Sequence, residues 1–230
     1  MAVESALPDA SVELYFNLGP FGRHVSGSRS GPALVHRAAW VVGPRDQPLH
    51  VVKETRDCDI VAIRLHPWMA ECVLGAPASD LRGSMVDLDE FWGTDVDSVR
   101  NDLHRSGDPV ARLAIVERAV AARARRGMTD DVRAAEQLCR AVECDWHTTV
   151  GGMAAANGLT HRRVIEVFDR AVGLKPKAYQ RVRRLRRVLR LAHETPRPTW
   201  TSIAHRCGTL SPDTHPTSPW SRSTPVRLAR

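Results

Sequence analysis

The stretch GLTHRRVIEVFDRAVGLKPKAYQRVRRLRRVLR, residues 158–190, is the most basic part of the chain, yet it keeps a regular apolar stripe. Apolar residues recur at the spacings of one helix face, at Val164, Val167, Phe168 and Ala171. Thr160 is placed to cap this helix, and Gly158 supplies the backbone freedom of a tight turn before it. The stretch therefore predicts a helix with one buried side and one side rich in arginine.

The residues on either side of this helix predict a short helix before it and a long helix after it. TVGGMAAANG, residues 149–158, predicts a short helix that ends at an Asn-Gly pair, and Leu159 can fill the space behind the turn. Gly173 ends the second helix, and Pro176 opens a long helix that is expected to run to about His193. Its expected apolar stripe is Tyr179, Val182, Leu185, Val188 (or Leu189) and Ala192. Two helices joined by a tight turn indicate a helix-turn-helix, whose second helix enters the major groove of DNA.

Charge is concentrated in the same place. The chain has 230 residues and a formal net charge of +7. Between His161 and Arg190, eleven Lys and Arg stand against Glu166 and Asp169, so this segment carries +9 and the remainder −2. Such clustering favours a polyanionic partner, with nucleic acid first and an acidic membrane surface second. No apolar stretch approaches the length that spans a bilayer, and the N-terminus lacks a secretory signal pattern.

Side chains at the start of a recognition helix reach base edges, where Arg suits the two acceptors of guanine and Glu accepts from cytosine. The candidates for base contacts are His161, Arg162, Arg163 and Glu166. Later basic side chains more often hold phosphates, which set position rather than sequence. The candidates for phosphate contacts are Arg170, Lys175, Lys177, Arg181 and Arg184. The alternative is a solvated helix face on which Glu166 and Asp169 simply pair with neighbouring arginines.

The N-terminal half has a different pattern, in which apolar or alternating runs are separated by Gly, Pro, Ser and Asp clusters. The expected strands lie within 11–18, 33–43, 49–52 and 58–65. Helices are expected at 94–107, at 108–126 with Asp108 as its cap and Pro109 in its first turn, and at 130–143. The sequence thus predicts an α+β N-terminal domain, a small β barrel or sandwich with helices, followed by an all-α helix-turn-helix domain. The expected divisions are 10–126, 128–208 and a disordered tail, 209–230.

The basic segment resembles the first helix-turn-helix of the AraC-type transcription regulators and the helix that joins it to their second one. The shared residues are an Ala of the first helix, Gly158, Thr160, Arg162, Phe168, Gly173, Pro176, Tyr179 and Arg184. The resemblance covers about 130–208, and the run F-x4-G-x2-P-x2-Y is its most specific part. FNLGP, VVGPR, IRLHP and VDLDEFWG resemble a domain of uncharacterised role that precedes this module. The resemblance implies a sensor or dimerisation domain joined to a DNA-binding domain, with duplex DNA, a small-molecule effector and a second copy of the chain as partners.

Two features depart from the family pattern. Glu166 stands where the family commonly has a basic residue, which bears on base preference and affinity. Members of the family follow the helix expected at 199–208 with a second recognition helix, whereas here four prolines, Pro212, Pro216, Pro219 and Pro225, interrupt any helical period. The expectation is a second module that stops after its first helix, through a frameshift or a natural truncation.

Other functional classes find less support. The sequence contains no GxSxG, HExxH or P-loop motif, so we expect no enzyme and no cofactor. Arg64, His66 and the acids of 87–90 could line a pocket, although a strand end and a polar loop explain them better. Five scattered cysteines favour reduced thiols in the cytoplasm. Cys139, Cys144 and His147 lack an evident fourth metal ligand. We expect Trp40, Trp68 and Trp92 in the core, with a ligand pocket as the minority alternative.

The sequence leaves three hypotheses for function. The first is a DNA-binding transcription regulator that uses the helix starting at Thr160. The second is a truncated remnant that no longer binds DNA and serves as a ligand- or protein-binding module. The third and weakest is an enzymatic N-terminal domain.

Overall fold

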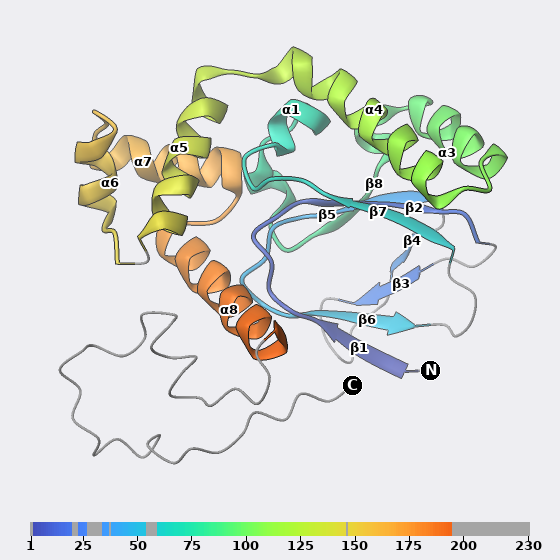
Figure 1. Cartoon of the computed structure of the whole chain (residues 1–230), viewed down its shortest axis with the longest axis horizontal. Helices are drawn as coiled ribbons and strands as arrows, with labels where there is room; N and C mark the ends of the chain where they lie inside the picture. The colour runs from blue at the N-terminus through green and yellow to red at the C-terminus, as the bar shows by residue number, and fades with distance from the viewer. Residues whose placement is uncertain are drawn as a thin grey trace.

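The computed structural model describes residues 2–19, 23–26, 34–36, 38–53, 59–145 and 147–194. Eight strands in this part form two four-stranded antiparallel sheets (Figure 1). The first sheet has the order β1 (Ala2–Ala6), β6 (Leu49–Lys53), β3 (Arg23–Ser26) and β4 (Leu34–His36). The second has the order β7 (Ile60–Arg64), β2 (Glu13–Asn17), β5 (Ala39–Val42) and β8 (Met85–Asp87). The helix expected at 199–208 and the tail 209–230 lie outside the described residues.

The second sheet builds the core of the N-terminal half. β2 lies between β7 and β5, and Leu14 pairs with Ile63 on one side and Val41 on the other. Leu14 and Val41 are fully buried, as an apolar strand covered on both faces should be. The three tryptophans expected in the core, Trp40, Trp68 and Trp92, are all buried. The sequence expectation for them is confirmed.

Short and long helices cover this sheet on the side away from the first sheet (Figure 1). They are α1 (Ala70–Leu74), the 3₁₀ helix η1 (Ala78–Leu81), α2 (Asp89–Trp92), α3 (Asp95–Arg105) and α4 (Pro109–Gly127). α4 packs against α1, α3 and β7. Its N-terminus forms as expected, because the Asp108 carboxylate accepts the backbone N–H groups of Val110 and Ala111.

In the described part of the second half, residues 130–145 and 147–194, every regular element is a helix. It consists of α5 (Asp130–Cys144), α6 (Val150–Ala156), α7 (His161–Val167), a π-helical turn η2 (Phe168–Val172) and α8 (Pro176–Glu194). Each of the first three helices is capped by a threonine side chain, at Thr129, Thr149 and Thr160. An α+β half followed by a helical half is the arrangement that the sequence predicts.

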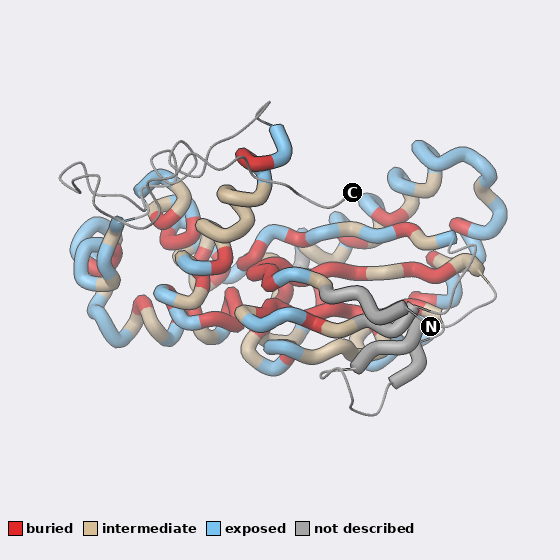
Figure 2. The backbone as a smooth tube through the Cα atoms, turned by 90° about the horizontal axis from the view of Figure 1, so that it is seen from below, coloured by how far each residue is buried: buried red, intermediate tan, exposed pale blue. Residues whose placement is uncertain are grey.

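The two halves share one apolar core. A single cluster of buried side chains runs from Ala10 in the N-terminal half, called the sheet half below, to Val182 on α8 in the helical half. Figure 2 shows buried segments in the sheets and in the helices alike. η2 packs against η1, and the Arg82 side chain donates to the Gly173 carbonyl across this contact. The end of the α7–η2 segment is therefore anchored on the N-terminal half.

Gly158 and Gly173 offer a matched pair of tests, because both have a positive φ, 63° and 74°. A Cβ atom at Gly158 would have no neighbour within 4 Å, whereas one at Gly173 would lie 2.5 Å from the Ala78 carbonyl oxygen. We expect Gly158→Ala to lower the free energy of unfolding by about 1–2 kcal/mol, the cost of a left-handed backbone. Gly173→Ala should lower it by about 1–3 kcal/mol more, because backbone must move. Urea unfolding of both variants measures this difference, and equal losses would contradict the close packing of η2 on η1.

Candidate nucleic-acid interface

α6 and α7 are joined by a tight turn. Gly158 takes the left-handed conformation there, and the Leu159 N–H donates to the Ala154 carbonyl at 2.9 Å. Leu159 is partly buried against the core. The Thr160 hydroxyl then accepts the Arg163 N–H at 3.1 Å, which satisfies an amide in the first turn of α7. These contacts fix the direction in which α7 leaves the turn.

One face of α7 and η2 is buried as the sequence predicts. Val164, Val167, Phe168 and Ala171 are each at most 1% exposed. The Phe168 ring lies 5.5 Å from the Tyr179 ring at a tilt of 60°, so α8 packs directly behind this segment. Because η2 is anchored on η1, the start of α7 is the end that projects away from the sheets (Figure 1).

The candidates for base contacts lie at this projecting end. His161 and Arg162 are exposed, and the Arg162 side chain is 90% exposed. Arg162 Nε donates to Glu166 Oε1 at 2.8 Å, one helical turn along, and this bond lowers the pKa of Glu166. Arg163 forms ion pairs with Asp131 on α5 and with Glu166. The pairing of Glu166 with neighbouring arginines, an alternative raised by the sequence, is thus present.

The candidates for phosphate contacts are spread over a wider surface. Arg170 pairs with Glu71 on α1, its Nε lying 3.2 Å from Glu71 Oε2. Arg181 Nη2 lies 3.8 Å from Oδ2 of Asp46, a residue that follows β5 along the chain. Both arginines are therefore held toward acids of the N-terminal half, a contact that their sequence positions do not reveal.

The start of α8 is more open. Lys177 is exposed and forms no ion pair within the described part of the chain. Lys175 is exposed and lies 3.2 Å from Asp169. Although burial acts in the opposite direction, hydrogen bonds from Arg82 and Lys175 lower the pKa of Asp169. Arg184 is partly buried. Of the nine candidates, His161, Arg162 and Lys177 are exposed and make no ion pair with another described helix or strand, whereas Arg163, Arg170, Lys175 and Arg181 pair with acids of other segments.

The other sites considered from the sequence are not brought together. Arg64 and His66 line a cavity of about 430 Å³, whereas Asp87 and Asp89 line a different one of about 210 Å³. Among the described residues, no group of three His, Cys, Asp or Glu side chains is arranged to hold a metal ion. No helix of the described ranges is long and apolar enough to cross a membrane.

The chain has similarity to a solved structure but not to a protein-family model or a curated protein. No protein-family model matches the chain, and no curated protein matches it by sequence. Among solved structures, the chain is similar to the crystal structure of ToxT from Vibrio cholerae O395. That similarity covers 90% of this chain and 82% of ToxT, with 8% sequence identity and a TM-score of 0.49.

Proposed function

We propose that this protein is a cytoplasmic transcription regulator that binds duplex DNA through the helix beginning at Thr160. The observation that carries the proposal is the exposed start of α7, where His161 and Arg162 project from a helix whose opposite face is fully buried. In helix-turn-helix proteins, the N-terminal residues of the second helix contact base edges while the first helix crosses the backbone. The sequence resemblance to AraC-type regulators agrees with this use of α7.

The surrounding charges set the expected strength of binding. Lys177 and Lys175 stand at the start of α8, where exposed amides add to the attraction for phosphate. Arg170 and Arg181 would have to exchange a carboxylate for a phosphate before they could contribute. Glu166 reduces the positive charge next to Arg162. We therefore propose modest affinity, of which the salt-sensitive phosphate contacts supply the larger part.

Arg162→Ala is expected to weaken binding to the preferred DNA fragment by about 5- to 100-fold, the discrimination that one good base contact supplies. The measurement is a salt-dependent titration of the full chain with genomic fragments around its own gene. Arg118→Ala is the matched control, because Arg118 is also an exposed helical arginine but lies on α4. Equal binding by the wild-type chain and both variants would exclude α7 as the reading helix.

The second candidate function is a ligand- or protein-binding module without specific DNA binding. It is favoured by the pairing of many basic side chains of 161–190 with acids, including those of Arg163, Arg170, Arg181 and Arg183. In that case the titration would show no preferred fragment at any salt concentration. We also propose the division into a sensor or dimerisation domain (10–126) and a DNA-binding domain (128–208), and self-association as a dimer.

A further inference from the structure

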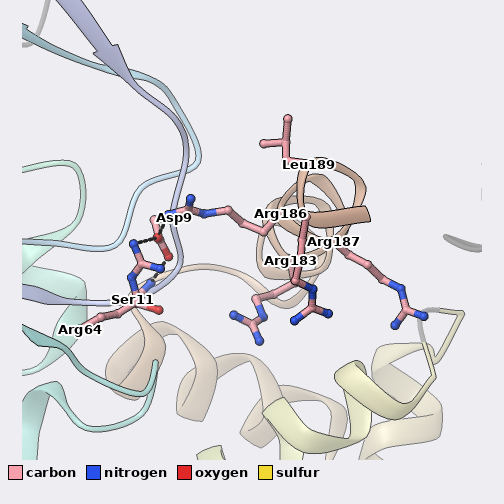
Figure 3. Close-up of a pocket in the computed structure, with 8 residues that line it drawn as sticks. Asp9, Ser11, Arg64, Arg183, Arg186, Arg187 and Leu189 are labelled. Atoms are coloured by element: carbon pink, nitrogen blue, oxygen red, sulfur yellow. Dashed lines mark hydrogen bonds and ion pairs between the residues drawn. The ribbon is translucent and has the colours of Figure 1, made fainter. Parts of the chain in front are cut away.

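A cavity lies between α8 and the N-terminal half, on the side of α8 away from the exposed start of α7. Its volume is about 350 Å³, and its walls are the segment around Asp9 and Ser11, the end of β7 at Arg64, and one face of α8. Figure 3 shows Arg186 extending from α8 to Asp9, with Arg183 and Arg187 leaving the same helix. A neighbouring cavity of about 430 Å³ shares Ser11, Arg64 and Arg183 with it. Both cavities lie along the contact between the N-terminal half and the helical half.

The lining of this cavity is dominated by one kind of side chain. Five arginines contribute to it, namely Arg64, Arg183, Arg186, Arg187 and Arg190. Asp9 is the one acid among the described residues of the lining, so these residues together have a formal charge of +4. Nearby carboxylates compensate part of this charge, since Glu13 pairs with Arg64 and Glu143 with Arg183.

The arginines follow the spacing of a helix face. Residues 183, 186, 187 and 190 lie three or four apart along α8, the spacing of one helix face, and Arg186 extends from this face to Asp9 (Figure 3). A helix face that packs against another part of the same protein is usually apolar. Among the described residues that line this cavity, Leu189 is the only hydrophobic one. Packing alone therefore does not explain this choice of residues.

A guanidinium group presents several donors in a planar fork that matches carboxylate and phosphate oxygens. A volume of about 350 Å³ lies at the small end of the range for ligand pockets. It can hold a small metabolite, whereas a DNA duplex is too wide to enter. A ligand with two acidic groups would offset the charge of the lining better than a monoanion.

We propose that this cavity binds a small organic anion that carries two acidic groups, either phosphates or carboxylates. The ligand would bridge α8 and the segment around Asp9, and so would tie the helical half to the sheet half. This inference does not rest on DNA binding, because it is tested by the direct binding of the ligand.

The experiment is calorimetric titration of the full 230-residue chain with pyrophosphate and, separately, with succinate at fixed ionic strength. We expect saturable binding of at least one probe, with a Kd of about 0.1–1 mM. Binding of pyrophosphate alone would assign a phosphate ligand, and binding of succinate alone a carboxylate ligand. The double variant Arg187→Gln/Arg190→Gln should weaken this binding by about tenfold or more, because charged hydrogen bonds are lost.

The matched control is Arg118→Gln/Arg125→Gln on α4, which removes the same charge from exposed positions outside the cavity lining. It should change the Kd by less than about twofold, as expected for screened distant charges. Equal weakening in both double variants would overturn the site, as would the absence of saturation at about 10 mM probe. Loss of DNA binding in Arg187→Gln/Arg190→Gln, without anion binding in the wild type, would instead assign these arginines to DNA. If the double variant does not fold, Arg190→Gln alone serves, since Arg190 is exposed.

Discussion

Replacing Phe168 with alanine is expected to lower the free energy of unfolding by about 3–5 kcal/mol, the usual cost of removing a fully buried aromatic ring. The Phe168 side chain is 0% exposed and lies against the Tyr179 ring, which is also fully buried. Because Phe168 is fully buried, solvent-exposed side chains cannot fill the space that its ring leaves. The loss should therefore be near the upper end of the range for core substitutions.

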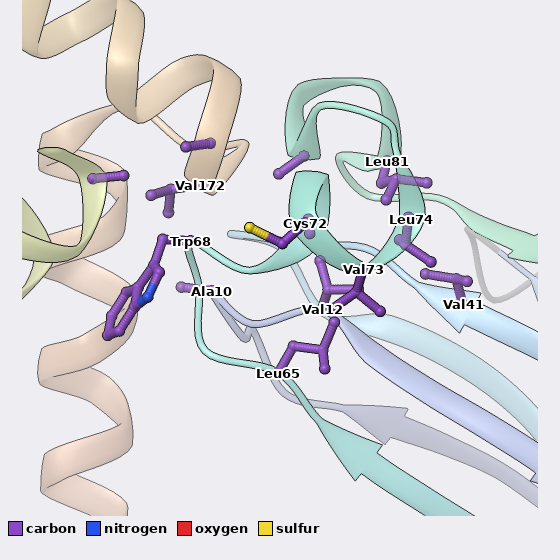
Figure 4. Close-up of a cluster of buried hydrophobic side chains, with 14 of the residues drawn as sticks. Ala10, Val12, Val41, Leu65, Trp68, Cys72, Val73, Leu74, Leu81 and Val172 are labelled. Atoms are coloured by element: carbon purple, nitrogen blue, oxygen red, sulfur yellow. The ribbon is translucent and has the colours of Figure 1, made fainter. Parts of the chain in front are cut away.

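The same substitution should destabilise both halves together. Phe168 belongs to the cluster that also contains Ala10, Trp68 and Leu81 of the N-terminal half. Figure 4 shows Val172, which belongs to η2 like Phe168, beside Trp68 of the N-terminal half. Because the core is continuous, the proposed domains 10–126 and 128–208 should unfold in one transition.

Urea unfolding followed by far-UV and near-UV circular dichroism measures this prediction, because the far-UV signal follows the helices and the buried Trp40, Trp68 and Trp92 contribute three of the six tryptophans to the near-UV signal. Leu113→Ala is the control, because Leu113 is 50% exposed and its loss should cost about 0.5 kcal/mol or less. Two separate transitions, with only the helical one shifted by Phe168→Ala, would show that the halves fold independently.

The helical half could be predicted closely because its signals are local. Threonine caps, the turn at Gly158 and the apolar spacing of α7 each involve residues within one or two helical turns of one another. The expected strands overlap the second sheet well, whereas β1, β3 and β8 were not expected. Their sequences, AVESA, RHVS and MVD, each contain one β-branched or aromatic residue, whereas AWVV of β5 and IVAIR of β7 each contain three, so they carry a weaker strand signal.

The candidate site could be predicted in part for the same reason. The cap at Thr160 and the exposure of Arg162 follow from helix geometry alone. The partners of Arg170 and Arg181, Glu71 and Asp46, are about a hundred residues or more away along the chain. No spacing rule connects such residues, because only the docking of η2 and α8 on the sheet half brings them together.

Arg186→Met is expected to lower the free energy of unfolding by about 1.5–3 kcal/mol, because it removes one of the two arginine partners of the buried Asp9 carboxylate. The Asp9 side chain is 4% exposed, and it contacts Arg186 on α8 and Arg64 Nη2 at 3.3 Å. Its other oxygen accepts the Ser11 N–H at 3.0 Å. The Arg186 side chain is 32% exposed, and this partial burial lowers the pKa of its guanidinium.

The ion pair of Asp9 and Arg186 can be tested by a double-mutant cycle. In Asp9→Asn/Arg186→Met the buried group is neutral, so the double variant should be more stable than Arg186→Met by about 1 kcal/mol or more. Arg190→Met is the control, because Arg190 lies one turn further along α8, is exposed and has no ion pair among the described residues. Its effect should be within about 0.5 kcal/mol of zero. Equal losses in Arg186→Met and Arg190→Met would show that Asp9 does not hold α8 against the sheet half, since a solvated arginine would then account for both.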